Sequence, residues 1–107
     1  MVDFDMVCDR DLHLKAEASG LRSARAEVKK FWEIGMQIAP GAFEREPAPY
    51  GIQDDHTAFQ KAGIPSFVVI DFEYEPFYNT TEDTPDKCSV QSLEAVGRTL
   101  LRYLYLP

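Results

Sequence analysis

Residues 54–70 read DDHTAFQKAGIPSFVVI, and this stretch decides the fold because it joins a short helix to a buried strand. Asp54 or Asp55 can cap a helix that ends near Gly63, a residue suited to a helix C-terminus. Residues 67–70 are a continuous run of β-branched and aromatic side chains, typical of a central strand buried on both faces. The stretch therefore predicts one helix–strand unit of an α/β fold.

Shorter strands are expected before this unit. Residues 2–7 place apolar side chains at every second position, as a short strand does. Residues 12–16 alternate in the same way and predict a second, edge-like strand, which Ser19-Gly20 would end. Residues 42–44 are a further candidate for a short strand, within a loop rich in proline and glycine.

Two longer helices are predicted from apolar periodicity. Residues 23–39 have an apolar side and a charged side, and Pro40-Gly41 ends the pattern. Residues 89–105 form the last helix, with Ser89 as its expected N-cap. The apolar stripe of this helix is Leu93, Val96, Leu100, Leu101 and Leu104. Strands alternating with helices predict the α/β class, in which ligands bind at the C-terminal ends of the strands.

The composition limits the classes of function. The chain has 107 residues and a formal charge of −7, which argues against a nucleic-acid surface and against adhesion to anionic membranes. No apolar run approaches the roughly 20 residues of a membrane span, and the acidic start MVDFDMVCDRD predicts no signal peptide. Cys8 and Cys88 fit neither a disulfide framework nor a zinc motif and are expected as free, half-buried thiols. We expect one small domain over residues 1–107.

Three acidic segments carry the possible chemistry, and each also has a structural explanation. Asp5 follows a predicted strand, where a carboxylate is either a metal ligand or a solvated loop acid. Asp54 and Asp55 either bind a ligand or only begin a helix, where capping and the helix dipole favour acids. Residues 78–84, YNTTEDT, form either a ligand-binding loop or a polar loop before the last helix. From the residues alone these alternatives stay open.

Four motifs together carry a resemblance: Asp5-Met6-Val7-Cys8-Asp9, Asp54-Asp55-His56, Gly63-Ile64-Pro65 and Asn79-Thr80-Thr81-Glu82-Asp83-Thr84. From about Asp3 to Leu104, the chain resembles the C-terminal half of the zinc-dependent aminopeptidase and glutaminyl cyclase-like superfamily. The resemblance implies a partial three-layer sandwich in which a short mixed sheet is flanked by helices. The chain departs from the family at Cys8, where the family has glycine, and at Asn79, where it has histidine.

The resemblance implies a role for each motif. Asp5 stands where the two-zinc members bind a metal and where the one-zinc cyclases place a hydrogen-bonding aspartate beside the metal. Asn79 stands at the position of a zinc-binding histidine, and it is a degenerate ligand position because a carboxamide is a poor zinc ligand. Asp54 and Asp55 are the implied substrate-binding acids, while His56 has a structural role. The implied apolar walls of the pocket are Phe72, Tyr74 and Tyr78.

The family's other half supplies a His-x-Asp segment, a bridging aspartate and a Glu-Glu pair with the general base, and none of these is found in the chain. The resemblance therefore implies zinc in the family, but neither tight zinc binding nor catalysis by this chain alone. The favoured function is a non-catalytic C-terminal part of such a protein. The alternative is a part of an active metal-dependent aminopeptidase or glutaminyl cyclase that acts on peptide N-termini.

Half of a sheet also leaves an unpaired strand edge and apolar helix faces. Three arrangements would cover them: a homo-oligomer, a complementing N-terminal half on a separate chain, or a longer protein of which this chain is a part. For the chain on its own, we expect the homo-oligomer.

Overall fold

The chain forms an α/β fold in a computed structural model that describes residues 1–72, 80–81 and 84–105. The elements follow in this order: β1 (Val2–Asp5), α1 (Ala18–Ser23), α2 (Arg25–Ile38), α3 (Asp55–Lys61), β2 (Phe67–Ile70), the 3-10 turn η2 (Pro85–Lys87) and α4 (Val90–Tyr105). Within these described ranges, no helix is long and apolar enough to cross a membrane.

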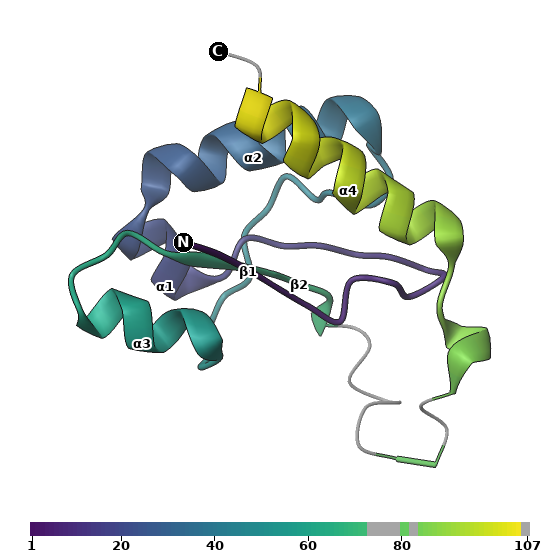
Figure 1. The fold of residues 1–107 in the computed structure, drawn as a ribbon, viewed down its shortest axis with the longest axis horizontal. Helices are drawn as coiled ribbons and strands as arrows, with labels where there is room; N and C mark the ends of the chain where they lie inside the picture. Colours follow the sequence, from purple (N-terminus) through teal and green to yellow (C-terminus); the bar gives the residue numbers. More distant parts are fainter. Residues whose placement is uncertain (73–79, 82–83, 106–107) are drawn as a thin grey trace.

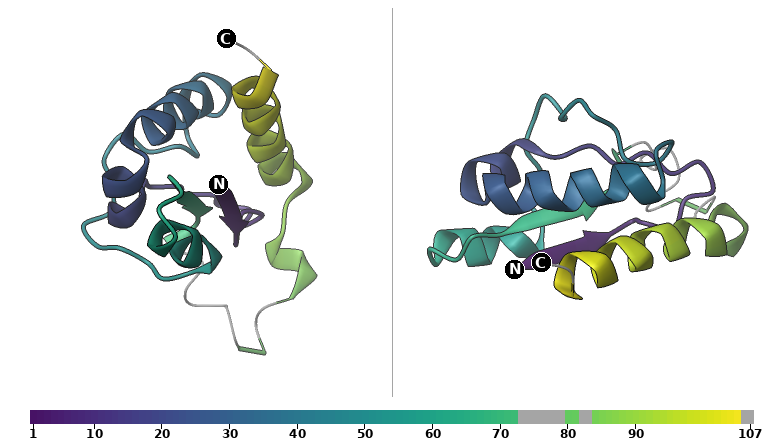
Figure 2. Two further views of the ribbon diagram at one scale, coloured as in Figure 1. Left: turned by 60° about the vertical axis from the view of Figure 1, so that its left-hand side comes forward. Right: turned by 90° about the horizontal axis from the view of Figure 1, so that it is seen from above.

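β1 and β2 lie at the centre and pair in parallel, with Val2 opposite Phe67 and Asp5 opposite Ile70. Figures 1 and 2 show α2 and α4 over one face of this two-stranded sheet and α3 on the other face. The predicted α/β class and partial three-layer sandwich are confirmed. Antiparallel pairing in the described residues is confined to isolated bridges, one of them between Leu14 and Asp71.

Phe31 of α2 is the centre of the hydrophobic core and is fully buried. Its ring lies with centroid separations of 5.4 to 6.0 Å from five other aromatic rings, those of Phe4, Trp32, Phe43, Phe67 and Tyr103. Aromatic pairs at these separations add to the stability gained from burial. The partners come from β1, β2, α2, α4 and the loop after α2, so one side chain joins the sheet to its helical cover.

The elements predicted from strong local patterns are confirmed. β2 spans the predicted residues 67–70, and all four are buried. The helices predicted over residues 23–39 and 89–105 are α2 and α4, each with bounds shifted by one or two residues. Ser89 caps α4, because its hydroxyl accepts a hydrogen bond from the Ser92 N–H at 3.4 Å.

The edge strand predicted over residues 12–16 is wrong. Only Leu14 there makes β-bridges, with Phe43 and Asp71, and the segment otherwise runs as an extended loop. Ser19-Gly20 also does not break the structure but lies in the first turns of α1. The reason is Glu17, whose side chain accepts hydrogen bonds from the N–H groups of both residues and so begins a helix.

The apolar stripe predicted for α4 faces the core only in part. Val96 is buried, whereas the exposed fractions of Leu93, Leu101 and Leu104 are 46%, 59% and 59%. The other side chains of α4 that are buried are the polar Ser92 and Thr99. The helix is therefore rotated so that most of its leucines point away from the core that the described residues form.

The prediction of free thiols is wrong, because Cys8 and Cys88 form a disulfide with their Cα atoms 4.7 Å apart. The two segments also exchange hydrogen bonds, from the Ser89 N–H to the Cys8 carbonyl at 2.6 Å and from the Arg10 N–H to the Lys87 carbonyl at 2.9 Å. Residues after β1 are thus joined to the start of α4. This pairing depends on the tertiary structure and is invisible in the spacing of two cysteines.

Gly35 of α2 lets the helix approach Phe43 closely. A Cβ atom at this position would lie 2.5 Å from atoms of the Phe43 ring, whereas a Cβ at Gly97 of α4 would meet nothing within 4 Å. Gly35 and Gly97 therefore differ in the space available beside them.

We predict that Gly35→Ala lowers the free energy of unfolding by about 1–3 kcal/mol, because the core must shift to admit a methyl group. Gly97→Ala should instead raise it by about 0.5–1 kcal/mol through helix propensity. Urea denaturation followed by circular dichroism measures both. Equal stability of the two variants would show that Phe43 does not pack on Gly35.

Candidate functional site

Four aspartates gather where the C-terminal end of β1 meets the N-terminus of α3. Carboxylate oxygens of Asp3, Asp54 and Asp55 lie within 4.8 Å of one another. Asp5 makes a side-chain hydrogen bond with Asp54. Asp3 and Asp5 share one face of β1 because alternate residues of a strand point the same way. We call these four residues the acidic cluster.

The N-terminus of α3 holds Asp54 in place. The Asp54 carboxylate accepts a hydrogen bond from the Asp55 N–H at 2.7 Å, while the Asp54 N–H donates to the Thr57 hydroxyl at 3.2 Å. The Asp54 carboxylate also accepts from the Thr57 N–H, and together with the contact to the Thr57 hydroxyl this forms a capping box. The positive end of the helix favours both acids. The structural explanation for this motif is therefore correct, and it coexists with the gathering of acids around it.

Met6 turns the chain immediately after Asp5. Its φ of 52° lies in the left-handed region, which non-glycine residues rarely adopt. Such strained positions concentrate near functional sites. In the described residues the turn falls at Met6, two residues before Cys8, the position at which the resembled family has glycine.

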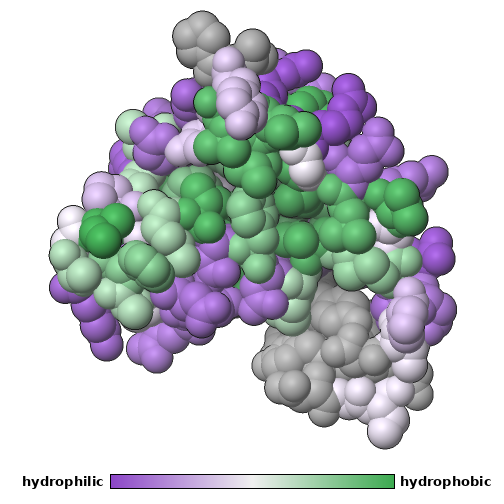
Figure 3. All heavy atoms as spheres, viewed as in Figure 1, coloured by the Kyte–Doolittle hydropathy of each residue, from purple (hydrophilic) through white to green (hydrophobic). Residues whose placement is uncertain are grey.

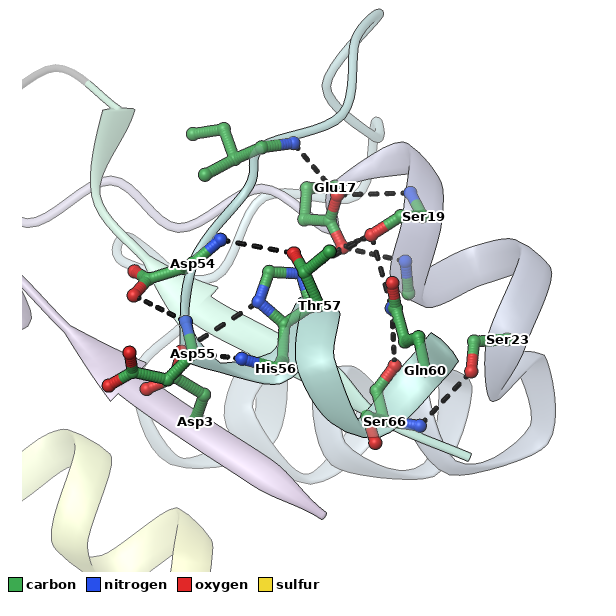
Figure 4. Close-up of polar contacts among 12 residues, drawn as sticks. Asp3, Glu17, Ser19, Ser23, Asp54, Asp55, His56, Thr57, Gln60 and Ser66 are labelled. Carbon is green, nitrogen blue, oxygen red and sulfur yellow. Dashed lines mark hydrogen bonds and ion pairs between the residues drawn. The ribbon is translucent and has the colours of Figure 1, made fainter. Parts of the chain in front are cut away.

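A buried histidine lies behind the acidic cluster (Figure 4). The His56 side chain is fully buried, and its Nε2 lies 3.3 Å from both Glu17 Oε1 and the Ser19 hydroxyl. Its Nδ1 lies 3.7 Å from Asp3 Oδ2 and makes no hydrogen bond within the described part of the chain. His56 thus connects Glu17 to the acidic cluster and faces into the protein.

Glu17 is the buried anion of this network. Its carboxylate accepts hydrogen bonds from the N–H groups of Ser19, Gly20 and Ile52 and from the Ser19 hydroxyl. Burial acts to raise the pKa of Glu17, but the hydrogen bonds outweigh it and hold the pKa below its ordinary value. An ionised Glu17 therefore ties α1, the loop before α3 and His56 into one unit that fixes the position of Asp54.

The acidic cluster retains protons that isolated aspartates would lose. Desolvation, followed by the hydrogen bond with Asp54 and the charge of Asp54, raises the pKa of Asp5 to about 6. Burial and then the Asp54 charge also raise the pKa of Asp3. Crowded carboxylates of this kind can accept a proton, bind an amino group or bind a cation.

The described residues alone do not fit a zinc site. Zinc in proteins prefers imidazole and thiolate ligands with about three protein ligands in catalytic sites. The acidic cluster supplies carboxylates, His56 is directed towards Glu17 and Asp3, and both cysteines are in the disulfide. His13 lies between Asp11 and Glu44, with Nε2–Oδ1 and Nδ1–Oε2 distances of 3.1 and 3.6 Å.

The structure brings together three of the residues singled out from the sequence: Asp5, Asp54 and Asp55. The Phe72 ring lies edge-on to the Tyr50 ring at a centroid distance of 5.3 Å. Tyr74, Tyr78 and Asn79 lie outside the described residues.

Sequence reasoning missed Asp3 and Glu17. The alternation of Asp3 with Asp5 on one strand was a usable signal for Asp3. The sequence signal for Glu17 is weaker: it is an acidic residue between two alanines, and it directly precedes a helix.

The chain matches one protein family and several solved structures. The sequence matches the model of peptidase family M28 over residues 1–104. The chain is similar to the solved glutaminyl cyclase of Fimbriiglobus ruber, with 32% identity and a TM-score of 0.88 over 95% of this chain and 34% of that one. It is also similar to the Tannerella forsythia glutaminyl cyclase, with 25% identity and a TM-score of 0.89. A Zn-dependent exopeptidase from Parabacteroides distasonis is similar too, with 25% identity and a TM-score of 0.88. Each of these two matches covers 99% of this chain and 39% of the solved one.

The chain spans less than two-fifths of the length of these solved structures. None of the curated proteins compared with the chain matches it.

We predict that Glu17→Gln lowers the free energy of unfolding by about 2–4 kcal/mol, because an amide NH₂ would face backbone N–H donors and His56 would lose its anion. Glu46→Gln, at an exposed carboxylate elsewhere, is the matched control and should change stability by less than about 0.5 kcal/mol. Urea denaturation at pH 7 distinguishes the two. A neutral effect at Glu17 would mean that the network does not hold α1 and α3 together.

A second prediction concerns pH. Because the folded-state pKa of Asp5 is raised above its unfolded value of 3.8 to about 6, the folded state keeps a proton that the unfolded state loses between these pH values. Stability should therefore fall as pH rises through this window. Asp5→Asn removes the loss and should be more stable than the original chain by about 1 kcal/mol at pH 7.5, after allowance for solvent screening, with little difference below pH 4. An advantage independent of pH would contradict the shift.

Proposed function

Since the chain belongs to peptidase family M28, we propose that it is the C-terminal part of a zinc aminopeptidase- or glutaminyl cyclase-like protein and does not catalyse by itself. The similarity to glutaminyl cyclases and to a Zn-dependent exopeptidase supports the first statement. The second rests on one observation, which is that the described residues around the acidic cluster offer carboxylates and a single imidazole, that of the buried His56, whose Nδ1 lies 3.7 Å from Asp3 Oδ2 and whose Nε2 contacts Glu17.

The chemistry of the cluster supports a place in a peptide-binding site. Asp5 and Asp54 lie at the C-terminal end of a parallel strand, where α/β folds place ligands. Crowded carboxylates bind an ammonium group well, and a peptide N-terminus carries one. In this proposal Asp54 and Asp55 contact the substrate, Asp5 lies at the metal position, and Phe72, Tyr74 and Tyr78 line the pocket.

The alternative is that the chain is a part of an active enzyme acting on peptide N-termini. The observation in its favour is the buried Glu17–His56 network, which keeps Asp54 in position although the described residues do not complete a site. When bound, zinc would polarise a carbonyl and activate water or an amine. The histidine and glutamate groups that such chemistry needs would come from the complementary part of the domain.

We predict that the purified chain contains less than about 0.1 zinc ion per molecule and does not cyclise a glutaminyl peptide or cleave an aminoacyl anilide, because zinc catalysis needs about three protein ligands. Zinc content is measured by mass spectrometry and turnover by chromatography. Stoichiometric zinc together with turnover would contradict the proposal and favour the alternative.

A companion variant tests the ligand position. Asn79→His should raise the zinc affinity measured by calorimetry at least about tenfold over the original chain, because imidazole replaces a poor ligand. Asn79→Ala is the control and should leave the affinity low. Equal affinities of the histidine and alanine variants would mean that the other ligands are not arranged around residue 79.

A further inference from the structure

We propose that a groove along α2 binds a small amphipathic anion, which has an apolar body and a carboxylate head group. We call it the α2 groove, with Trp32 on its floor and Arg25, Lys29 and Arg45 on its rim. Seen from above in Figure 2, the loop after α2 arches beside this helix on the side away from α4. The groove shares no residue with the acidic cluster, so the inference does not depend on the proposed function.

The floor of the α2 groove is apolar and belongs to the hydrophobic core. Ala16, Val28 and Trp32 line it and are buried, with exposed fractions of 8%, 3% and 5%. Leu21, from α1, also lines the groove and packs against the same core. The Trp32 indole N–H donates a hydrogen bond to the Leu14 carbonyl at 3.3 Å, which fixes the orientation of the ring. The floor is therefore preformed, as the apolar walls of ligand sites usually are.

The rim of the α2 groove is cationic, although the chain as a whole is acidic. Arg25 and Lys29 come from α2 and Arg45 from the loop after it, and all three are exposed. None of the three forms an ion pair with a described residue. Glu33 is the acidic lining residue, so three cations and one anion give the lining a formal charge of +2, in a chain of −7. The local charge therefore attracts an anion to this groove.

The α2 groove differs in shape from the larger apolar surface of the molecule. Figure 3 shows hydrophobic side chains gathered along α4, where Leu101 and Leu104 are each 59% exposed. In the α2 groove the apolar side chains are instead recessed beneath a charged rim. A concave apolar floor with a few charged groups around it is typical of a small-molecule site.

The size of the α2 groove indicates the class of ligand. A water-sized group occupies about 30 Å³, so the volume of about 330 Å³ holds about eleven non-hydrogen atoms. A polypeptide partner would instead need about 800 Å² of surface on each side of a stable interface. An alkyl chain or a single aromatic ring with a carboxylate has the right size. The fork of an arginine guanidinium matches a carboxylate, so Arg25 and Arg45 are the groups that we assign to the head group.

Octanoate is the probe, because it combines an alkyl chain with a carboxylate in about ten non-hydrogen atoms. Calorimetry measures its Kd, and NMR follows the indole N–H of Trp32, which gives one resonance because the chain has one tryptophan. We expect a Kd of about 0.1–1 mM, in the range for a ligand of this size, and a shift of the Trp32 resonance on binding. Octylammonium, which reverses the charge, and acetate, which lacks the apolar body, should each bind at least about tenfold more weakly.

Two charge reversals test the rim, Arg25→Glu on α2 and Arg45→Glu on the loop. The matched control is Arg98→Glu, at an exposed position of α4 outside the groove, which changes the net charge equally. Each rim variant should weaken octanoate binding at least about tenfold, and the control less than about twofold, because salt screens a distant charge. All three side chains are exposed, so the variants should keep the fold, which circular dichroism verifies.

Three results would overturn the inference. The first is a Kd of octanoate above about 10 mM, which would mean that the groove is not a binding site for this class of ligand. The second is equal affinity for octanoate and octylammonium, which would show apolar contact without selection for an anion. The third is octanoate binding that leaves the Trp32 resonance unmoved, or that weakens as much in Arg98→Glu as in the rim variants, which would place the anion elsewhere.

Discussion

The buried contact between Glu17 and His56 is the constraint on which the rest of the site depends. Both side chains are fully buried, so the charge of Glu17 is tolerable only because four hydrogen bonds and the imidazole surround it. Those contacts come from α1, from the loop before α3 and from α3 itself. The acidic cluster therefore sits on a rigid base, although the cluster itself is crowded and electrostatically unfavourable.

The helical layer of α2 and α4 is not packed as completely as this buried network. The core around Phe31 is complete between the sheet and α2, but α4 buries only Val96, Ser92 and Thr99 and leaves most of its leucines exposed. A fully buried network beneath the acidic cluster, together with an α4 whose leucines are mostly exposed, is what a part of a larger domain would show. They agree with a chain that matches peptidase family M28 throughout but spans less than two-fifths of its solved relatives.

The sequence predicts what local patterns control. β2, the capping of α3 by Asp54 and the bounds of α2 and α4 follow from runs of a few residues, and the structure confirms them. Contacts between distant segments were not predictable in this way. The Cys8–Cys88 disulfide, the contact of Glu17 with Ile52 and the rotation of α4 all depend on partners 30 to 80 residues away or on surfaces that periodicity does not describe. The proximity of Asp5 to Asp54 lies between these cases, since only a family resemblance linked two acids so far apart in the chain.

In the isolated chain, the buried network of Glu17 and His56 holds Asp54 beside Asp5. Carbon-13 NMR of the aspartate carboxyl groups, followed as a function of pH, tests it most directly. We expect Asp5 to titrate near pH 6 and Asp54→Asn to move this titration towards the ordinary range of an aspartate. An Asp5 that titrates together with the exposed aspartates, and is unaffected by Asp54→Asn, would contradict it.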